Sequence, residues 1–243
     1  MKTLLKLTLA ISLTLLGISE SNAQWGNKKV VGNGNITTKT VNTGNYDGIK
    51  GVGSMDIHLE KGSEGTITVT TDDNLHEYLS IEVKDNTLVI KTKKNTYLKT
   101  KKGIHITVPF NDISEVALVG SGDIDTKDTV KSDELEVRVT GSGDVDLAVE
   151  ANMVEASVTG SGDMVLSGST NSLEVSVTGS GDFKGSDLES QNTEARVSGS
   201  GDARVVAKQS LKARVNGSGD ITYSGNPEKS DTKTSGSGDI SSN

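Results

Sequence analysis

The sequence predicts an all-β fold: a right-handed parallel β-helix, or β-solenoid, with rungs of about 19 residues and an N-terminal β cap region. The first observation is a repeated tetrapeptide, GSGD, which recurs at steps of 21, 19, 19, 20, 18 and 19 residues. Its seven copies begin at Gly120, Gly141, Gly160, Gly179, Gly199, Gly217 and Gly236. A period of this length indicates similar structural units that stack on one another.

The second observation is the alternation of apolar residues on both sides of each GSGD. Two residues before the turn stand Leu118, Val139, Val158, Val177, Val197 and Val215. Directly after the aspartate stand Ile124, Val145, Met164, Phe183, Ala203, Ile221 and Ile240. A period of two is typical of half-buried strands. One repeat buries little surface, whereas stacked repeats share a continuous core. The crossover rule predicts a right-handed coil.

The third observation is composition. Only 3% of the residues are aromatic, 28 are glycine and none is cysteine. This suits short strands joined by glycine turns, and it excludes a disulfide framework.

The opening segment has the layout of a cleavable secretory signal. Lys2 and Lys6 precede a short apolar run, and small residues end at Ala23. We therefore predict a signal peptide over residues 1–23 and a mature chain that begins at Gln24. The later sequence has no stretch of about 18 apolar residues, which predicts no transmembrane segment. The protein is expected to be exported to the periplasm, to the outer surface or into the medium.

Residues 24–113 are predicted to form the N-terminal β cap and the first rungs. "GTITVTT" and "NTLVIKTKK" alternate cleanly, Asp85 and Asn86 indicate a hairpin turn, and "DDNLHEYL" indicates a short helical turn capped by Asp72. "GSMDIHL", residues 53–59, resembles a degenerate "GSGDIDT" and is interpreted as an early rung displaced by an insertion. Residues 114–243 are predicted to form a GSGD-repeat solenoid of about six rungs, continuous with 24–113 as one domain.

Together these segments resemble a known family. The serial "VTGSGD" turns, with "YDGIKGVGSMDIHLEKGSEGTITVTT" and "IHITVPFNDISEVALVGSGDI" before them, are similar to the "putative autotransporter adhesin, head GIN domain" family, formerly a domain of unknown function common in Bacteroidetes. The resemblance extends from about residue 33 to the end. It implies an exported β-helical protein with the cell surface as one destination, and it carries over no catalytic motif.

The GSGD turn itself has two interpretations. Glycine permits positive φ at a sharp corner, and aspartate can accept hydrogen bonds from nearby backbone N–H groups in an Asx-type turn. Stacking would also place the aspartates in a file with a spacing of about 5 Å, where like charges attract cations such as calcium. The sequence favours the structural turn and leaves calcium open. The file comprises Asp123, Asp144, Asp163, Asp182, Asp202, Asp220 and Asp239.

Charge is unevenly distributed along the chain. Residues 118–243 carry 11 basic and 21 acidic side chains, whereas residues 24–117 carry 12 and 11. Within "KTKKNTYLKTKK", lysines surround Tyr97 at positions Lys91, Lys93, Lys94, Lys99, Lys101 and Lys102. This patch could contact an anionic glycan, lipopolysaccharide or a membrane. Alternatively, its lysines could prevent an edge strand from pairing with other chains, and the sequence favours this second interpretation. The net charge of −8 argues against a nucleic-acid partner.

No catalytic motif is present: HExxH, GxSxG, a Walker loop and a cysteine nucleophile are all absent. His58, His76 and His105 are scattered and are not expected to share a metal site. We expect no cofactor beyond the calcium alternative. "DTV" at Asp128 matches an O-glycosylation acceptor tripeptide used in Bacteroidetes, which would place Thr129 on an exposed corner.

The function predicted from these features is that of a noncatalytic, adhesin-like or scaffold protein. Its elongated surface would bind a glycan, an envelope component or a protein. The alternative is a glycan-active enzyme similar to β-helical polysaccharide lyases and hydrolases. Convergence of acidic or polar side chains from neighbouring rungs in one groove would favour the enzyme.

Overall fold

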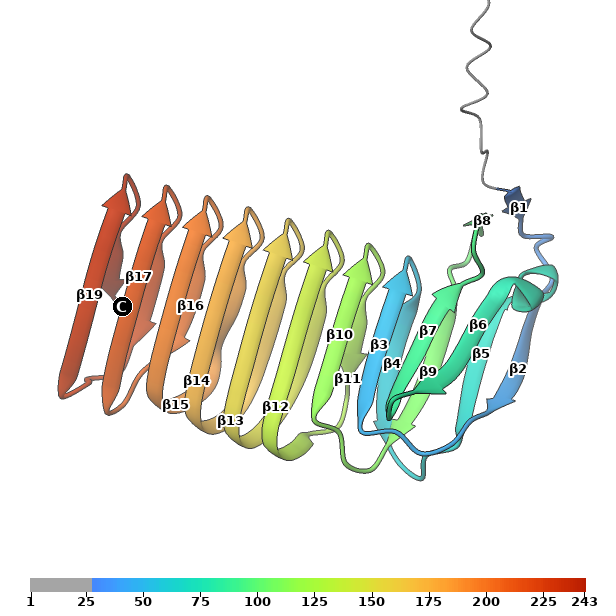
Figure 1. Ribbon diagram of the computed structural model, residues 1–243, viewed down its shortest axis with the longest axis horizontal. Helices are drawn as coiled ribbons and strands as arrows, with labels where there is room; N and C mark the ends of the chain where they lie inside the picture. The colour runs from blue at the N-terminus through green and yellow to red at the C-terminus, as the bar shows by residue number, and fades with distance from the viewer. Residues whose placement is uncertain (1–27) are drawn as a thin grey trace, which may run out of the picture.

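A computed structural model gives the architecture of the protein and describes residues 28–243. The predicted signal peptide, 1–23, and its cleavage site lie outside this range. The described chain is a β-solenoid of stacked parallel coils, about seven turns long with a spacing of about 19 residues (Figure 1). The prediction of about six rungs in 114–243 rests on the six intervals between the seven GSGD turns. The strand before Gly120 closes a further coil.

Each coil is flattened and has two faces, joined on one side by the GSGD turn. The first face contains the strands that precede GSGD, paired in parallel. In spatial order these are β7 (Thr87–Thr92), β3 (Gly48–Gly53), β10 (Glu115–Gly120), the C-terminal parts of β12 (Val130–Gly141), β13 (Val145–Gly160), β14 (Met164–Gly179) and β15 (Phe183–Gly199), then β17 (Ser210–Gly217) and β19 (Lys229–Gly236).

The second face contains the strands that follow the turn, also paired in parallel. In spatial order these are β9 (His105–Phe110), β4 (Asp56–Lys61), β11 (Ile124–Thr126), the N-terminal parts of β13, β14 and β15, then β16 (Ala203–Val206), β18 (Ile221–Ser224) and β20 (Ile240–Ser242).

The displaced early rung is confirmed. β3 and β4 form a coil whose Gly53 lies in register with Gly120, and Ile57 with Ile124. The inserted segment then returns and places β7 and β9 on the other side of that coil. Coil order along the stack therefore differs from chain order.

Antiparallel strands complete the cap at this end of the stack (Figure 1). β5 (Thr66–Asp72) and β2 (Ile36–Asn42) extend the second face, and β6 (Leu79–Lys84) extends the first. The predicted hairpin turn joins β6 to β7, with φ of 48° at Asp85 and 62° at Asn86, as a two-residue type I′ turn requires.

The helical turn is present as a 3₁₀ helix, η1 (Asp73–Tyr78), and Asp72 occupies the predicted N-cap position. Asp72 makes no side-chain capping hydrogen bond. Its carboxylate instead accepts hydrogen bonds from the Gly34 N–H at 2.5 Å and the Thr100 hydroxyl at 2.7 Å. Both donors come from loops distant in sequence and bind different oxygens of this carboxylate, which a local capping rule does not anticipate.

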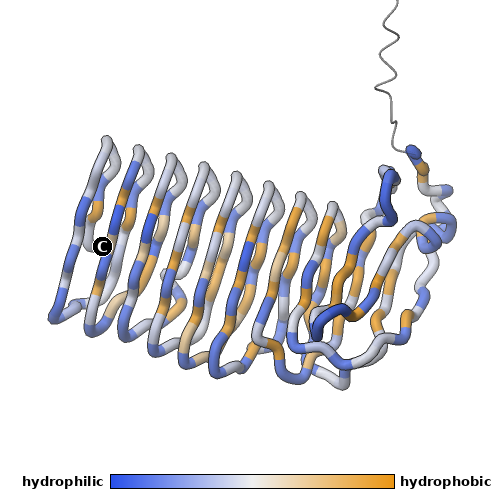
Figure 2. Tube along the Cα trace, in the orientation of Figure 1, coloured by the Kyte–Doolittle hydropathy of each residue, from blue (hydrophilic) through white to orange (hydrophobic). Residues whose placement is uncertain are grey.

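The core runs through the stack as one cluster from Tyr46 to Ile221. The valines two residues before GSGD, from Val139 to Val215, are paired in register and at most 2% exposed. Apolar positions recur from coil to coil in Figure 2. The predicted period-two burial is thus confirmed.

Candidate functional site

The GSGD turns are joined to one another through the backbone. In the first six turns the carbonyl of the first glycine accepts two hydrogen bonds from the next coil, one from serine and one from the second glycine, for example from Ser161 at 2.8 Å and Gly162 at 3.1 Å to Gly141. The first glycines adopt φ between 122° and 141° in the seven copies. Glycine is required there because L-residues rarely adopt these angles.

The aspartates also link neighbouring coils, which corrects the expected local Asx turn. Six of the seven carboxylates accept a hydrogen bond from the backbone N–H of the aspartate in the following coil, at 2.8–3.1 Å. The acceptors are Asp123, Asp144, Asp163, Asp182, Asp202 and Asp220, and Asp239 donates the last N–H. We call this file of seven side chains the aspartate ladder. One carboxylate oxygen of each acceptor therefore already accepts a backbone hydrogen bond in the absence of a cation.

Asp163 has an additional partner in this ladder. The Lys184 ammonium lies 2.6 Å from its carboxylate. Burial pushes the pKa of Asp163 upward, but hydrogen bonds from Lys184 and the Asp182 N–H outweigh it, so the pKa is lowered. The same hydrogen bond raises the pKa of Lys184. Lys184 thus neutralises part of the like-charge repulsion at the centre of the ladder.

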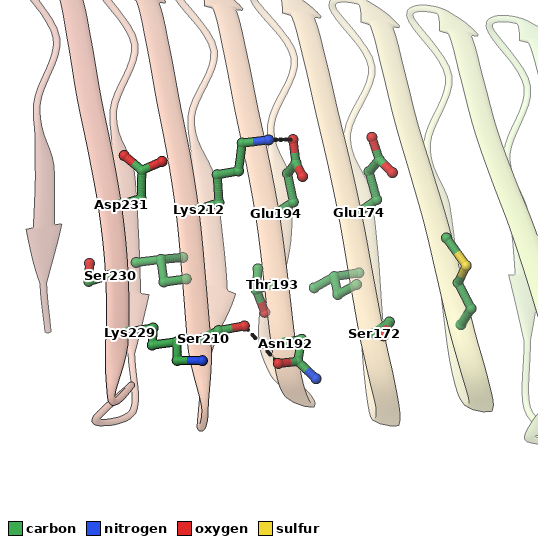
Figure 3. Close-up of a pocket in the computed structure, with 13 residues that line it drawn as sticks. Ser172, Glu174, Asn192, Thr193, Glu194, Ser210, Lys212, Lys229, Ser230 and Asp231 are labelled. Atoms are coloured by element: carbon green, nitrogen blue, oxygen red, sulfur yellow. Dashed lines mark hydrogen bonds and ion pairs between the residues drawn. The ribbon is translucent and has the colours of Figure 1, made fainter.

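A groove crosses the first face along the axis of the stack. It has a volume of about 450 Å³ and draws side chains from β13, β14, β15, β17 and β19. Figure 3 shows these side chains on successive strands. We call this hollow the face groove; it is lined by Met153, Ser172, Leu173, Glu174, Asn192, Thr193, Glu194, Ser210, Leu211, Lys212, Lys229, Ser230 and Asp231. A second hollow of about 290 Å³ continues it from Met153 toward Ser114.

The lining repeats because the strands are in register. Ser172, Asn192 and Ser210 are aligned, and their side chains provide hydroxyl and amide groups at successive rungs. Beneath them Leu173 and Leu211 are 2% exposed. Ser210 donates a hydrogen bond to the Asn192 side chain at 2.7 Å (Figure 3). The face groove therefore combines repeated polar groups with an apolar floor.

A file of acidic side chains runs along the first face, and two of its members, Glu174 and Glu194, line the face groove. Glu115, Glu136, Glu155, Glu174 and Glu194 are stacked in register. Sequence reasoning missed this file, although the alignment on GSGD contains it five residues before each of the first five turns. Most of these carboxylates have a basic partner: Arg196 binds Glu174 at 3.1 Å and also contacts Glu194, and Lys212 lies 3.0 Å from Glu194.

The lysines of the predicted patch differ in their pairing. Lys91 lies on β7, where its ammonium pairs with the Glu82 carboxylate at 3.0 Å. Lys93, Lys94, Lys99, Lys101 and Lys102 surround β8 (Thr96–Lys99), all exposed. β8 pairs in parallel with β1 (Lys28–Val31), a contact that the sequence did not predict.

Two of the three histidines meet. Nε2 of His58 lies 3.3 Å from Nδ1 of His105, and Nδ1 of His58 lies 2.7 Å from the Asp125 carboxylate. His76 lies apart beside Thr37, where burial and the nearby Lys39 charge lower its pKa. Among residues 28–243 no group of three or more His, Cys, Asp or Glu side chains is arranged to hold a metal ion.

Thr129 is exposed, on the corner where the acceptor tripeptide lies. In the part of the chain that the structure describes, no helix has the length and apolar character needed to span a bilayer.

These features define a β-solenoid of parallel coils with a ladder of turns along one edge and a groove along one face. The family model described as "Putative auto-transporter adhesin, head GIN domain" matches residues 45–227. The chain belongs to this family, and the resemblance inferred from the sequence is confirmed.

Solved structures agree on the fold. A protein of Bacteroides fragilis titled a putative adhesin is similar with a TM-score of 0.83 and 22% identity, over 88% of this chain and 100% of that chain. A Parabacteroides distasonis protein titled a putative lipid binding protein has a TM-score of 0.74 and 30% identity, over 89% and 100%. Another P. distasonis protein, titled a putative adhesin, has a TM-score of 0.70 and 27% identity, over 89% and 100%. The comparison with curated proteins gives no match.

Proposed function

We propose that the protein is an exported, noncatalytic adhesin-like protein that binds a linear glycan along the face groove. The observation that carries the proposal is the in-register lining of the groove across five strands. Strands stack at about 4.8 Å, so the hydroxyl and amide groups of Ser172, Asn192 and Ser210 recur at that interval on three neighbouring strands. A polymer with repeated hydroxyl groups can pair with them at each step.

The charges of the face groove support binding and argue against glycoside hydrolysis. A general acid in such an enzyme needs a raised pKa. The Arg214 hydrogen bond instead lowers the pKa of Asp231, and Glu174 and Glu194 are ion-paired. The groove lining also contains no aromatic platform. The adhesin titles of the family and of two relatives agree with this choice.

The test is a glycan array probed with the exported protein, followed by groove-filling substitution. Ser210→Phe places a ring across the groove on β17. Thr222→Phe, on β18 of the second face, is the matched control. We expect selective binding to one class of linear glycan, lost in Ser210→Phe and retained in Thr222→Phe.

Two outcomes would contradict this function. Binding that survives Ser210→Phe would place the ligand elsewhere. Release of new reducing ends from the bound glycan would instead support the glycan-active enzyme.

Export can be tested separately. Intact-mass analysis of the native protein should give a chain beginning at Gln24, and a retained Met1 would contradict export with signal cleavage.

A lipid ligand is a second candidate, favoured by a hollow in the cap. This hollow of about 380 Å³ includes Val41, Val69, Leu79 and Ile81 in its lining, and one relative's title names lipid binding. Displacement of a fluorescent fatty acid, weakened by Ile81→Gln and unaffected by Ser210→Phe, would support it. Equal displacement from both variants would contradict it.

A further inference from the structure

The end of the solenoid that carries the cap also carries a small ribbon of two parallel strands, β1 and β8. They lie side by side at this end, opposite the C-terminal coils (Figure 1). The register pairs Lys29 with Tyr97, Val30 with Leu98 and Val31 with Lys99. The ribbon is separate from the 18-stranded sheet that forms the solenoid and cap.

The two faces of this ribbon differ. Side chains of in-register neighbours share a face, and successive residues alternate between faces. Lys29, Val31, Tyr97 and Lys99 therefore share one face, and all four are exposed. The other face holds Val30 and Leu98, both half-buried, and Leu98 packs against the core. The exposed face is thus amphipathic, with two apolar or aromatic groups and two lysines.

Exposed apolar side chains are concentrated here. Among residues 28–243 the exposed large hydrophobic residues are Val31 at 54%, Ile36 at 39% and Tyr97 at 58%. Val31 and Tyr97 are on the ribbon, and Ile36 begins β2 five residues later. A single exposed apolar residue needs no explanation. Three at one end of an otherwise polar surface indicate a contact site.

Basic side chains are concentrated at the same end. Lys28 donates a hydrogen bond to the Tyr78 hydroxyl at 2.9 Å. The other lysines beside the ribbon form no side-chain hydrogen bond or ion pair with any residue in the range 28–243. The others are Lys29, Lys93, Lys94, Lys99, Lys101 and Lys102. By contrast, residues 118–243 carry 21 acidic and 11 basic side chains. An anionic surface would attract the ribbon and repel the solenoid.

We propose that the exposed face of the β1–β8 ribbon docks onto an anionic phospholipid bilayer. Lysines near such a surface bind by charge, and tyrosine and valine enter the interfacial region. A soluble polyanion would use the lysines but would gain nothing from Val31 and Tyr97. Docking through this end places the bilayer at the cap and leaves the face groove, on β13–β19, free. The proposal is independent of the glycan proposed for that groove.

Vesicle co-sedimentation of the exported protein tests the proposal. Vesicles of phosphatidylcholine alone are compared with vesicles that also contain phosphatidylglycerol, at low and high salt. We expect binding only to the anionic vesicles, weakened by salt because the Debye length shortens.

Two double variants separate charge from apolar contact. Lys29→Gln/Lys99→Gln should weaken binding at least about tenfold, and Val31→Ser/Tyr97→Ser should also weaken it. Lys233→Gln, an exposed lysine on β19, is the matched control and should bind as the wild type does. Circular dichroism melting confirms that each variant is folded, since Val30 and Leu98 still anchor the ribbon.

Three results would overturn the proposal. The first is no binding of the wild type to anionic vesicles at low salt. The second is equal binding by Lys233→Gln and the ribbon variants. The third is binding to soluble heparin, but not to vesicles, that is insensitive to Val31→Ser/Tyr97→Ser; that result would assign the lysines to an anionic glycan.

Discussion

At the scale of single residues, each GSGD turn is specified by the turn of the neighbouring coil. The aspartate carboxylate binds an N–H that lies 18–21 residues later in the chain. The glycines bring the two backbones into direct contact. Each residue of the motif therefore has a role between coils.

The aspartate bond can be tested at Asp144, which binds the Asp163 N–H at 2.8 Å and has no ion pair among the described residues. Asp144→Ala should lower the free energy of unfolding by about 1 kcal/mol. Asp144→Asn should cost less, because its amide oxygen still accepts the bond. Urea unfolding measures both.

The wild type and Asp144→Asn together test whether the aspartate ladder binds calcium. Melting temperatures in EDTA and in calcium should agree if the ladder needs no metal. A calcium-dependent rise in the wild type that Asp144→Asn abolishes would instead support the calcium-stabilised solenoid, by mass action.

The second glycine of the motif is fixed by space rather than by φ. A Cβ on Gly162 would lie 2.0 Å from the Gly143 carbonyl oxygen. Gly162→Ala should therefore cost several kcal/mol, of the order seen for strained core substitutions. The control is Gly44→Ala, where a Cβ meets no atom within 4 Å. Similar urea midpoints for the two variants would show that the coils can separate without loss.

The Asp163–Lys184 pair predicts a dependence on pH. The folded pKa of Asp163 is lowered, so its stabilisation is present above the unfolded value of about 3.9 and is lost as pH falls through the folded value. The pKa of Lys184 is raised, so its share is lost only at strongly alkaline pH. The side chains are 33% and 41% exposed, which limits the effect to under about 1 kcal/mol.

Lys184→Met is the variant for this pair. Its unfolding free energy should fall below that of the wild type at neutral pH, and the difference should shrink below about pH 4. Urea unfolding across pH measures the difference. A gap that stays constant into acid would show that lost packing, rather than charge, is responsible.

At the scale of elements, each strand is stabilised by its in-register neighbours on both sides. Val177 on β14 lies between Val158 and Val197 and is 1% exposed. Val177→Asp should cost several kcal/mol, because it buries an unpaired charge. Thr178→Asp, one residue later on the exposed side, should change stability little. Thermal melting of both variants measures the two losses of stability. Equal losses would contradict the inward orientation of Val177.

At the scale of the whole molecule, the stack is one-dimensional, so stability varies along it. In β19 all eight residues are exposed, and Thr232 and Thr234 stand in register with Ala213 and Val215. This coil buries little apolar surface. Amide hydrogen exchange should be fast in β19 and slowest in β13–β15. Uniform protection along the stack would contradict a gradient and indicate a partner on β19.

Features that depend on period and alternation could be predicted from the amino-acid sequence. The GSGD interval predicted the coil, and the apolar positions predicted the buried files from Val139 to Val215. Even the displaced coil at Gly53 could be identified, because it keeps the motif's spacing of glycine, serine and aspartate. These properties are local or repeat at a fixed interval, so they can be recognised in one amino-acid sequence.

Contacts between segments that share no repeat could not be predicted, because they depend on how the whole chain folds. Lys28–Val31 and Thr96–Lys99 have no common pattern, yet they form one ribbon. His58 and His105 meet only because the insertion returns β9 beside β4. The aspartate bond extends between coils rather than within its turn because stacking brings the next N–H within 2.8–3.1 Å of the carboxylate. Alternation determines which side of a strand is buried, whereas the neighbour across that strand depends on the path of the whole chain.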